Sequence, residues 1–278
     1  MIELDSIHHT DLLTLCSMCE PQSIDMILCD LPYGTTDYEW DKVVPIEPMW
    51  SAFKRIISPT GAIILTASQP FTSVLIASNL SMFKYEWIWV KARPSGFLHA
   101  KNKPLKTHEN ILVFSAGDTL HAGQSKNRMA YYPQMGQGKP YVKHNDPKVN
   151  LAWSDLRRPS RVEIHTTTNM GNRYPTSVLE YPNDNHDSLH PTQKPVALFE
   201  YLIRTYTQAG EVVLDPCVGS GTTAVAARNT GRRYITGDIT KEYVEIACER
   251  LAAPYMAPLF IETPDVTATE SRQEGLEL

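Results

Sequence analysis

Short apolar segments alternate with amphipathic ones along most of the 278-residue chain. Runs rich in Ile, Val, Leu and aromatic residues predict strands, and apolar positions spaced by three or four residues predict helices. The alternation of the two predicts an α/β fold with a doubly wound, mostly parallel sheet. The expected strands cover residues 26–29, 61–67, 85–91, 110–115, 212–215 and 233–239, and the expected helices cover 46–57, 70–82, 195–208, 222–230 and 241–252.

Residues 117–189 break this pattern, because they are rich in Gly, Pro, Asn, Lys, Arg and Tyr and show only weak periodicity. A loop of that length without structure of its own is uncommon in a compact domain. We therefore expect a small inserted module between two halves of one domain, at 1–116 and 190–262. The last residues, 263–278, are polar and acidic, which is typical of a disordered tail.

The composition is that of an ordinary globular protein, with 42% hydrophobic and 21% charged residues. No run approaches the roughly 20 apolar residues that span a bilayer, and the start M-I-E-L-D lacks a secretory signal pattern. We expect no membrane association and a cytoplasmic location. Cys16 and Cys19 have the spacing of a metal knuckle, but no second pair follows, so a helix face is the favoured interpretation and no metal site is predicted.

Charge is unevenly distributed along the chain. The net charge is −5, yet residues 84–173 hold 15 Lys and Arg against 6 Asp and Glu, whereas the flanking residues are strongly acidic. A basic middle on an acidic body is typical of a surface that binds a polyanion. A merely solvated basic surface is the alternative interpretation.

Two expected strands end in an aspartate followed by turn residues. The first is C-D-L-P-Y-G at 29–34, which places a carboxylate, a rigid turn and a large ring within four residues. The second is V-V-L-D-P-C-V-G-S-G-T-T at 212–223, where two glycines lead into a helix. Such a turn lets a ligand approach the backbone, and the helix start attracts an anionic group. The pattern also fits a dinucleotide enzyme, with Asp238 placed to bind a ribose.

Ligands of doubly wound sheets bind at the carboxyl ends of the strands. Both aspartate motifs therefore open onto one edge of the predicted sheet. A cofactor on the second motif and a substrate on the first is the simplest interpretation of this arrangement. An ordinary strand–helix turn is the alternative at each position.

D-L-P-Y at 30–33, H-P-T-Q-K-P at 190–195 and D-P-C-V-G-S-G-T-T at 215–223 occur in that order. Together they resemble the S-adenosylmethionine-dependent amino-group DNA methyltransferases. The order matches the permuted subgroup called β, in which the target-base motif precedes the cofactor loop. The resemblance covers most of residues 5–252, and it implies a Rossmann-like fold in which the inserted module recognises the DNA target.

The resemblance implies roles for individual residues. Asp30 and the carbonyl of Pro32 would accept hydrogen bonds from an exocyclic amine of the flipped base, and Tyr33 would stack on that base. The S-adenosylmethionine site would consist of Asp11, Thr192, Lys194, Asp215, Gly219, Gly221, Thr222, Thr223 and Asp238. Two positions depart from the family pattern: Leu31 replaces a usual proline, and Cys217 replaces a common aromatic residue.

Double-stranded DNA is the partner that this resemblance implies. In the basic middle of the chain, the candidates for phosphate or base contacts are Lys101, Lys103, Lys106, Arg157, Arg158 and Arg161. A second copy of the chain and a cognate restriction enzyme are further partners that the sequence leaves open.

Adenine N6 is the expected target, because the cytosine-N4 enzymes more often carry serine where this chain has Asp30. Cytosine N4 remains the first alternative. A relative that binds DNA and cofactor without catalysis, an enzyme acting on protein glutamine or RNA, and a nicotinamide enzyme are the others.

Overall fold

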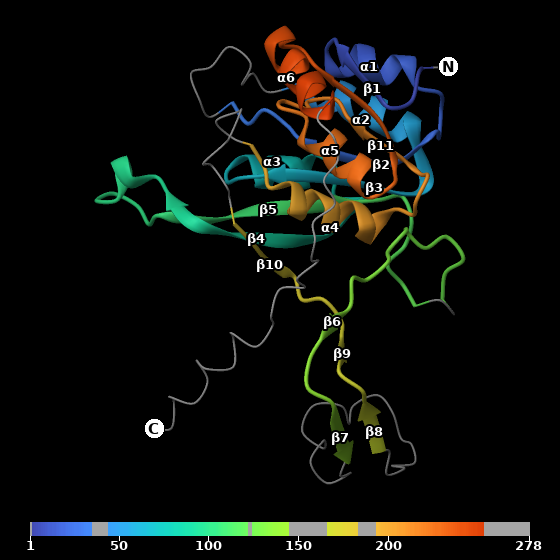
Figure 1. Cartoon of the computed structure of the whole chain (residues 1–278), viewed down its shortest axis with the longest axis vertical. Helices are drawn as coiled ribbons and strands as arrows, with labels where there is room; N and C mark the ends of the chain where they lie inside the picture. The colour runs from blue at the N-terminus through green and yellow to red at the C-terminus, as the bar shows by residue number, and fades with distance from the viewer. Residues whose placement is uncertain (1, 35–43, 122–123, 145–165, 183–192, 253–278) are drawn as a thin grey trace. The chain divides into compact units, whose positions relative to one another are not determined.

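The structure is a computed structural model, and it describes residues 2–34, 44–121, 124–144, 166–182 and 193–252 (Figure 1). The described residues divide into two compact units. The first comprises the residues up to 132 and those from 176 to 252, and the second lies within residues 133–175.

The first unit is built on an eight-stranded sheet with the order β1-β12-β11-β2-β3-β5-β4-β10. Neighbouring strands are parallel except where β5 pairs antiparallel with β3 and with β4. The strands are β1 (Ser6–His9), β2 (Ile24–Asp30), β3 (Ile57–Ala67), β4 (Phe83–Ser95), β5 (Lys106–Phe114), β10 (Val178–Tyr181), β11 (Val212–Asp215) and β12 (Arg233–Asp238).

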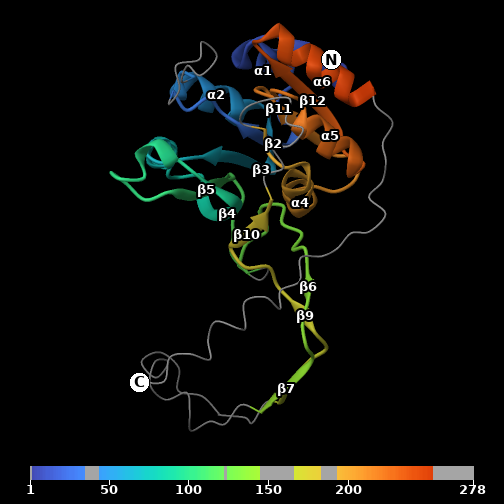
Figure 2. The same cartoon turned by 60° about the vertical axis from the view of Figure 1, so that its left-hand side comes forward.

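Helices cover both faces of this sheet (Figures 1 and 2). Successive strand residues point to opposite faces, so β2 sends Ile27 and Cys29 into one apolar cluster and Met26 and Leu28 into another. The first cluster is completed by α1 (Leu12–Met18), α2 (Ile46–Ile56) and α3 (Phe71–Ser78), and the second by α4 (Val196–Tyr206) and α5 (Thr222–Asn229). Helix α6 (Lys241–Ala252) packs near β1, β12 and α5.

The doubly wound, mostly parallel architecture expected from the sequence is confirmed. Each expected strand and helix is present, with ends that differ by a few residues. Two edge strands, β1 and β10, were not predicted. Both are only four residues long, and β1 includes two histidines, so neither has a distinctive apolar pattern. Strand β10 pairs with β4 in the main sheet although it lies in 117–189, the segment expected to form a separate module.

The second unit consists of two small antiparallel ribbons. One pairs β6 (Gly136–Gln137) with β9 (Asn172–Arg173), and the other pairs β7 (Tyr141–His144) with β8 (Thr166–Asn169). The Arg173 guanidinium lies 5.0 Å from the centre of the Tyr141 ring. Among the described residues of this unit there is no large buried apolar side chain. Its assignment as a target-recognition module stays a prediction.

Helix α4 is tied to the sheet by a buried tyrosine at its end. Tyr206 is fully buried, and its hydroxyl accepts a hydrogen bond of 2.6 Å from the Trp87 indole and shares another of 3.0 Å with the Tyr85 hydroxyl. A buried hydroxyl without partners would cost free energy, so these bonds specify how α4 sits on β4. The residues just before α4 are positioned as a consequence.

Gly221, immediately before α5, has two reasons to be glycine. Its φ of +88° is a left-handed conformation that other residues adopt at a cost. A Cβ atom there would also lie 2.9 Å from the Cβ of Ala247 in α6. The loop before α5 therefore touches α6 more closely than any side chain would allow.

We predict that Gly221→Ala lowers the free energy of unfolding more than Gly210→Ala does. Gly210 has a similar φ of +86°, but a Cβ atom added there would meet no atom of the described residues within 4 Å. The Gly210 variant therefore incurs only backbone strain of about 1–2 kcal/mol, whereas the Gly221 variant adds overpacking of about 1–3 kcal/mol. Urea denaturation of both variants measures the difference, and equal losses would contradict the close contact with α6.

Candidate active site

The carboxyl ends of the parallel strands meet at one edge of the sheet. Strands β2, β11 and β12 end in Asp30, Asp215 and Asp238. Thr66, near the end of β3, pairs in register with Asp30. The two motifs expected to share this edge therefore do so, at the end of four neighbouring strands.

The Asp30 carboxylate is held on both oxygens. Its Oδ1 accepts a hydrogen bond of 2.7 Å from the Tyr33 hydroxyl and another from the Thr66 hydroxyl. Its Oδ2 forms an ion pair with the Lys194 ammonium. The Asp30 side chain is still 22% exposed, whereas that of Lys194 is 6% exposed. Asp30 is thus oriented from within the protein and faces solvent on one side.

Lys194 belongs to a buried row of alternating charges. Beyond Asp30, its ammonium lies 3.6 Å from Oε2 of Glu109, and Oε1 of Glu109 pairs with Lys91. Burial alone would lower the pKa of Lys194, but the carboxylates of Asp30 and Glu109 outweigh burial and raise it. Burial likewise raises the pKa of Glu109, and Lys194 and Lys91 outweigh it, so this pKa lies below its ordinary value. Lys194 and Glu109 are therefore both charged at neutral pH.

Tyr33 and Leu31 are both anchored in the protein. The Tyr33 ring is half-buried, and its centre lies 5.5 Å from that of the Phe71 ring at an interplanar angle of 35°. Burial and the nearby Asp30 charge raise the pKa of the Tyr33 hydroxyl well above its ordinary value. Leu31 is 3% exposed and belongs to the apolar cluster under α1 to α3. Stacking of Tyr33 on a base stays a prediction.

The loop between β11 and α5 is shaped by Asp238. Its Oδ2 accepts a hydrogen bond of 2.9 Å from the Gly219 amide, and its Oδ1 accepts one of 2.8 Å from the Thr240 amide. Gly219 and Gly221 have φ values of +51° and +88°. No side chain among the described residues caps the start of α5. The amide groups of its first turn are thus available to a ligand.

Asp215 lies beneath the same loop and is 2% exposed. Its carboxylate accepts hydrogen bonds from the Thr223 hydroxyl and, at 3.0 Å, from the Cys217 amide. These donors favour the charged form, but burial outweighs them and raises the pKa of Asp215 to about 7. A cation bound beside Asp215 would favour its ionised form.

A family model of N6/N4 DNA methylases matches residues 24–249. The type II methyltransferase M.HpaI of Haemophilus parainfluenzae is 30% identical over 254 residues, which cover 85% of this chain and 70% of that protein. The chain belongs to this family of amino-group DNA methyltransferases. The DNA adenine methyltransferase YhdJ of Escherichia coli K12 is 24% identical over 261 residues, or 90% of this chain and 83% of that protein.

Solved structures of other methyltransferases share the fold. The M1.HpyAVI–SAM complex has a TM-score of 0.54 at 22% identity, with 88% of this chain and 98% of that chain covered. The PvuII DNA methyltransferase, described as cytosine-N4-specific, has a TM-score of 0.60 at 15% identity, with 90% and 87% covered. At these identities the likeness supports the fold and leaves the target base open.

The loop fits the cofactor of this family, S-adenosylmethionine. The uncapped start of α5 suits a carboxylate, and the buried Asp215 suits a cationic group. Residues Asp215, Gly219, Gly221, Thr222, Thr223 and Asp238 come together here as the sequence predicts, and their contacts with the cofactor stay predictions.

Other predicted site residues have visible roles in the protein itself. Asp11 is exposed and caps α1, accepting hydrogen bonds of 2.9 and 3.0 Å from the amides of Leu13 and Thr14. Lys194 was predicted beside the cofactor, and its carbonyl does lie 3.4 Å from the Thr222 hydroxyl. Its ammonium, however, is directed at Asp30. Thr192 lies outside the described residues.

The predicted DNA-binding residues are only partly described. Lys101 and Lys103 are exposed between β4 and β5, beside the short helix η1 (Phe97–His99). Lys106 begins β5, and its ammonium donates to the Ser68 hydroxyl. Residues Arg157, Arg158 and Arg161 lie outside the described residues.

Two site residues were missed by the sequence reasoning. Thr66 donates to Asp30, and Glu109 pairs with Lys194, although the sequence reasoning gave Glu109 no role. The end of the strand expected at 61–67 was a signal for Thr66, because that strand ends at the same edge as Asp30. Glu109 had no comparable signal, because its place depends on the antiparallel insertion of β5.

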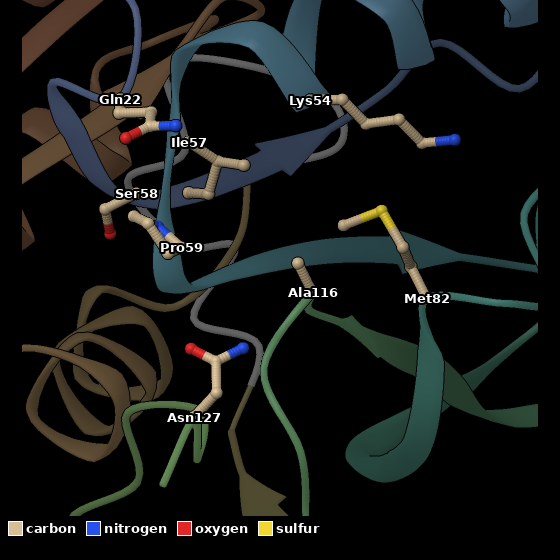
Figure 3. Close-up of a pocket in the computed structure, with 8 residues that line it drawn as sticks. All are labelled: Gln22, Lys54, Ile57, Ser58, Pro59, Met82, Ala116 and Asn127. Carbon is tan, nitrogen blue, oxygen red and sulfur yellow. The ribbon is translucent and has the colours of Figure 1, made fainter.

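Two further features lie apart from this chemistry. A cavity of about 350 Å³ is lined by Gln22, Lys54, Ile57, Ser58, Pro59, Met82, Ala116 and Asn127 (Figure 3). It lies where β3 begins, at the opposite end of the strands from Asp30.

Within the described part of the chain, no group of three or more His, Cys, Asp or Glu residues could hold a metal ion, and no helix could cross a membrane.

The raised pKa of Asp215 predicts a pH-dependent stability. Because the folded-state pKa of about 7 exceeds the ordinary value of 3.8, the folded state binds more protons between these values. The contribution of Asp215 to the free energy of unfolding is therefore fully present below about pH 4 and is lost as the pH rises through 7. The loss amounts to about 4 kcal/mol at most.

Asp215→Asn removes this titration, so we expect the stability difference between the wild type and the variant to fall as the pH rises from 4 to 8. Urea denaturation of both proteins at each pH measures this difference, in which the contributions of other groups cancel. A difference that does not change with pH would show that Asp215 titrates normally.

Proposed function

We propose that this methyltransferase transfers a methyl group from S-adenosylmethionine to the N6 amine of adenine in double-stranded DNA. The observation that supports this proposal most is the orientation of Asp30, which lies at the same edge of the sheet as the cofactor loop. A carboxylate held in this way can face an amine that enters from solvent, while the loop at Asp215 holds the methyl donor.

The chain's task is to strengthen a poor nucleophile. The lone pair of an exocyclic amine is delocalised into the base ring. Acceptors aimed at its two N–H bonds, namely Asp30 and the Pro32 carbonyl, favour a more tetrahedral nitrogen and restore its lone pair. Positioning and fixed electrostatics of this kind supply most of the rate.

When bound, S-adenosylmethionine would supply a methyl group carried on a sulfonium sulfur. The sulfur would keep the electron pair of the broken S–CH3 bond and become a neutral thioether. The amine nitrogen forms the new N–C bond with its lone pair and becomes positively charged. It then loses one proton, and Asp30 is the acceptor placed beside it. No covalent link to the protein is required.

The target amine lies inside the duplex, so the base must leave the stack. This extrusion costs a few kcal/mol, which contacts with the flipped base and the backbone must offset. Tyr33 is the proposed platform for the base. Lys101, Lys103 and Lys106 are proposed to neutralise phosphates, together with Arg157, Arg158 and Arg161 from the inserted module.

Adenine is preferred to cytosine because the acceptor is Asp30, where cytosine-N4 enzymes more often carry serine. The likeness to the adenine methyltransferase YhdJ over 90% of this chain supports this choice. Cytosine N4 is the alternative target, since the cytosine-N4-specific PvuII enzyme has the same fold. A cytoplasmic location in a bacterial or phage-infected cell and pairing with a restriction enzyme are further proposals, supported by bacterial type II relatives.

We predict that Asp30→Asn lowers the rate of methyl transfer by a factor of about 10² to 10³ without abolishing cofactor binding. The amide keeps the size of the side chain but loses the charge that faces the amine. Single-turnover transfer from tritium-labelled S-adenosylmethionine to unmethylated DNA measures the rate, and calorimetry with S-adenosylhomocysteine measures binding. Asp25→Asn is the matched control, because Asp25 lies on the same strand and binds the Val212 amide. A near-normal rate in Asp30→Asn would refute the role of Asp30.

The target base is tested by expressing the protein in a host that lacks DNA methylation and sequencing the DNA for modified bases. We expect N6-methyladenine in a defined sequence context, at a level that is reduced in Asp30→Asn. N4-methylcytosine would contradict the adenine assignment, and unmodified DNA would contradict the proposed activity.

A further inference from the structure

Glu109 is the least explained member of the charged row at the active site. Its side chain is 11% exposed, and its Oε1 pairs with Lys91. Its Oε2 is buried and has no hydrogen-bond donor among the residues that the structure describes. The nearest cation is the Lys194 ammonium at 3.6 Å, which is longer than a hydrogen bond.

Lys194 is therefore shared unequally between two carboxylates. Its ammonium contacts Oδ2 of Asp30 directly, whereas Oε2 of Glu109 lies 3.6 Å away. Strand alternation places Asp30, Thr66 and Glu109 on the face of the sheet that α4 covers. Each stands two positions along its strand from a member of the cluster beneath α4, namely Leu28, Ile64 and Ile111. The lysine that precedes α4 can thus reach both carboxylates.

In the proposed function, Lys194 and the target amine compete for the Asp30 carboxylate. The Oδ1 atom already accepts two hydroxyl donors, and Oδ2 holds the ammonium. An amine that enters the site must compete with Lys194 for Oδ2. The positive charge that develops on the methylated nitrogen would also be repelled by an ammonium at that point.

We propose that Glu109 is a positioning residue that takes up the Lys194 ammonium when the target amine binds, and so releases Oδ2 of Asp30. This inference rests on the proposed function. Closing the gap from 3.6 Å to a charge-assisted hydrogen bond of about 2.8 Å requires only a small movement of a flexible side chain. The bond would also supply the donor that Oε2 lacks. Lys91, paired on the other oxygen, keeps Glu109 ionised and in place.

The test compares Glu109→Gln with the wild type. The amide keeps the shape of the side chain but loses the negative charge that would compete with Asp30 for the ammonium, so Lys194 stays on Asp30. We expect the single-turnover rate on saturating unmethylated DNA to fall by about 10- to 100-fold, with unchanged affinity for S-adenosylhomocysteine at a temperature where the variant is folded. Glu86→Gln is the matched control, because Glu86 is an exposed carboxylate that binds the neighbouring Asn110 at 2.9 Å. Its rate should equal that of the wild type.

Removing the lysine distinguishes positioning from a general structural role. If Glu109 acts by drawing Lys194 away, Glu109→Gln has no further effect once Lys194 is removed, so the double variant with Lys194→Met is as fast as Lys194→Met alone. Independent roles would instead multiply the two single losses, and that result would overturn the inference. Loss of folding or of S-adenosylhomocysteine binding in Glu109→Gln would overturn it too, by assigning Glu109 a structural role.

The inference and the proposed function fail in different ways. A wild-type protein that does not methylate DNA contradicts the proposed function. A wild-type protein that does so, beside a Glu109→Gln variant of equal rate, contradicts only the role of Glu109.

Discussion

The ion pair between Asp30 and Lys194 is the interaction on which the site depends. A carboxylate at the edge of a sheet is useful as an acceptor only if it stays charged and points in one direction, although much of it is removed from water. Lys194, which stands just before α4, supplies the opposite charge. Glu109 and Lys91 continue this row of charges with alternating sign. Each buried charge thereby has a neighbour of the opposite sign, which a buried ion requires.

This row could not form without the surrounding packing. Lys194 stands two residues before α4, and α4 is held on the sheet by the buried hydroxyl of Tyr206. Glu109 comes from β5, the antiparallel strand inserted between β3 and β4. Asp30 and Lys194, which are 164 positions apart in the chain, therefore share one small region. The geometry of the site therefore depends on how α4 packs on the sheet and on the place of β5 within it.

The two aspartates that end β2 and β11 illustrate how environment separates similar residues. Asp30 faces solvent on one side and pairs with an ammonium. Asp215 is enclosed and accepts hydrogen bonds from the Thr223 hydroxyl and the Cys217 amide, but burial outweighs these donors and raises its pKa to about 7. The first can serve an amine that arrives from outside, whereas the second is suited to a cationic group held within the loop. Similar local sequences thus serve the substrate side and the cofactor side of one edge.

The sequence by itself determined the fold class, the interior strands and helices, and the edge at which both aspartate motifs meet, because apolar periodicity and parallel topology constrain all three. It did not predict β1 or β10, which are short edge strands whose pairing depends on β12 and β4. Only the tertiary structure decided that Leu31 is a core residue, that Lys194 turns toward Asp30, and that Glu109 joins them. Those contacts join residues distant in the chain, and local sequence patterns contain no information about which distant side chains will neutralise one another.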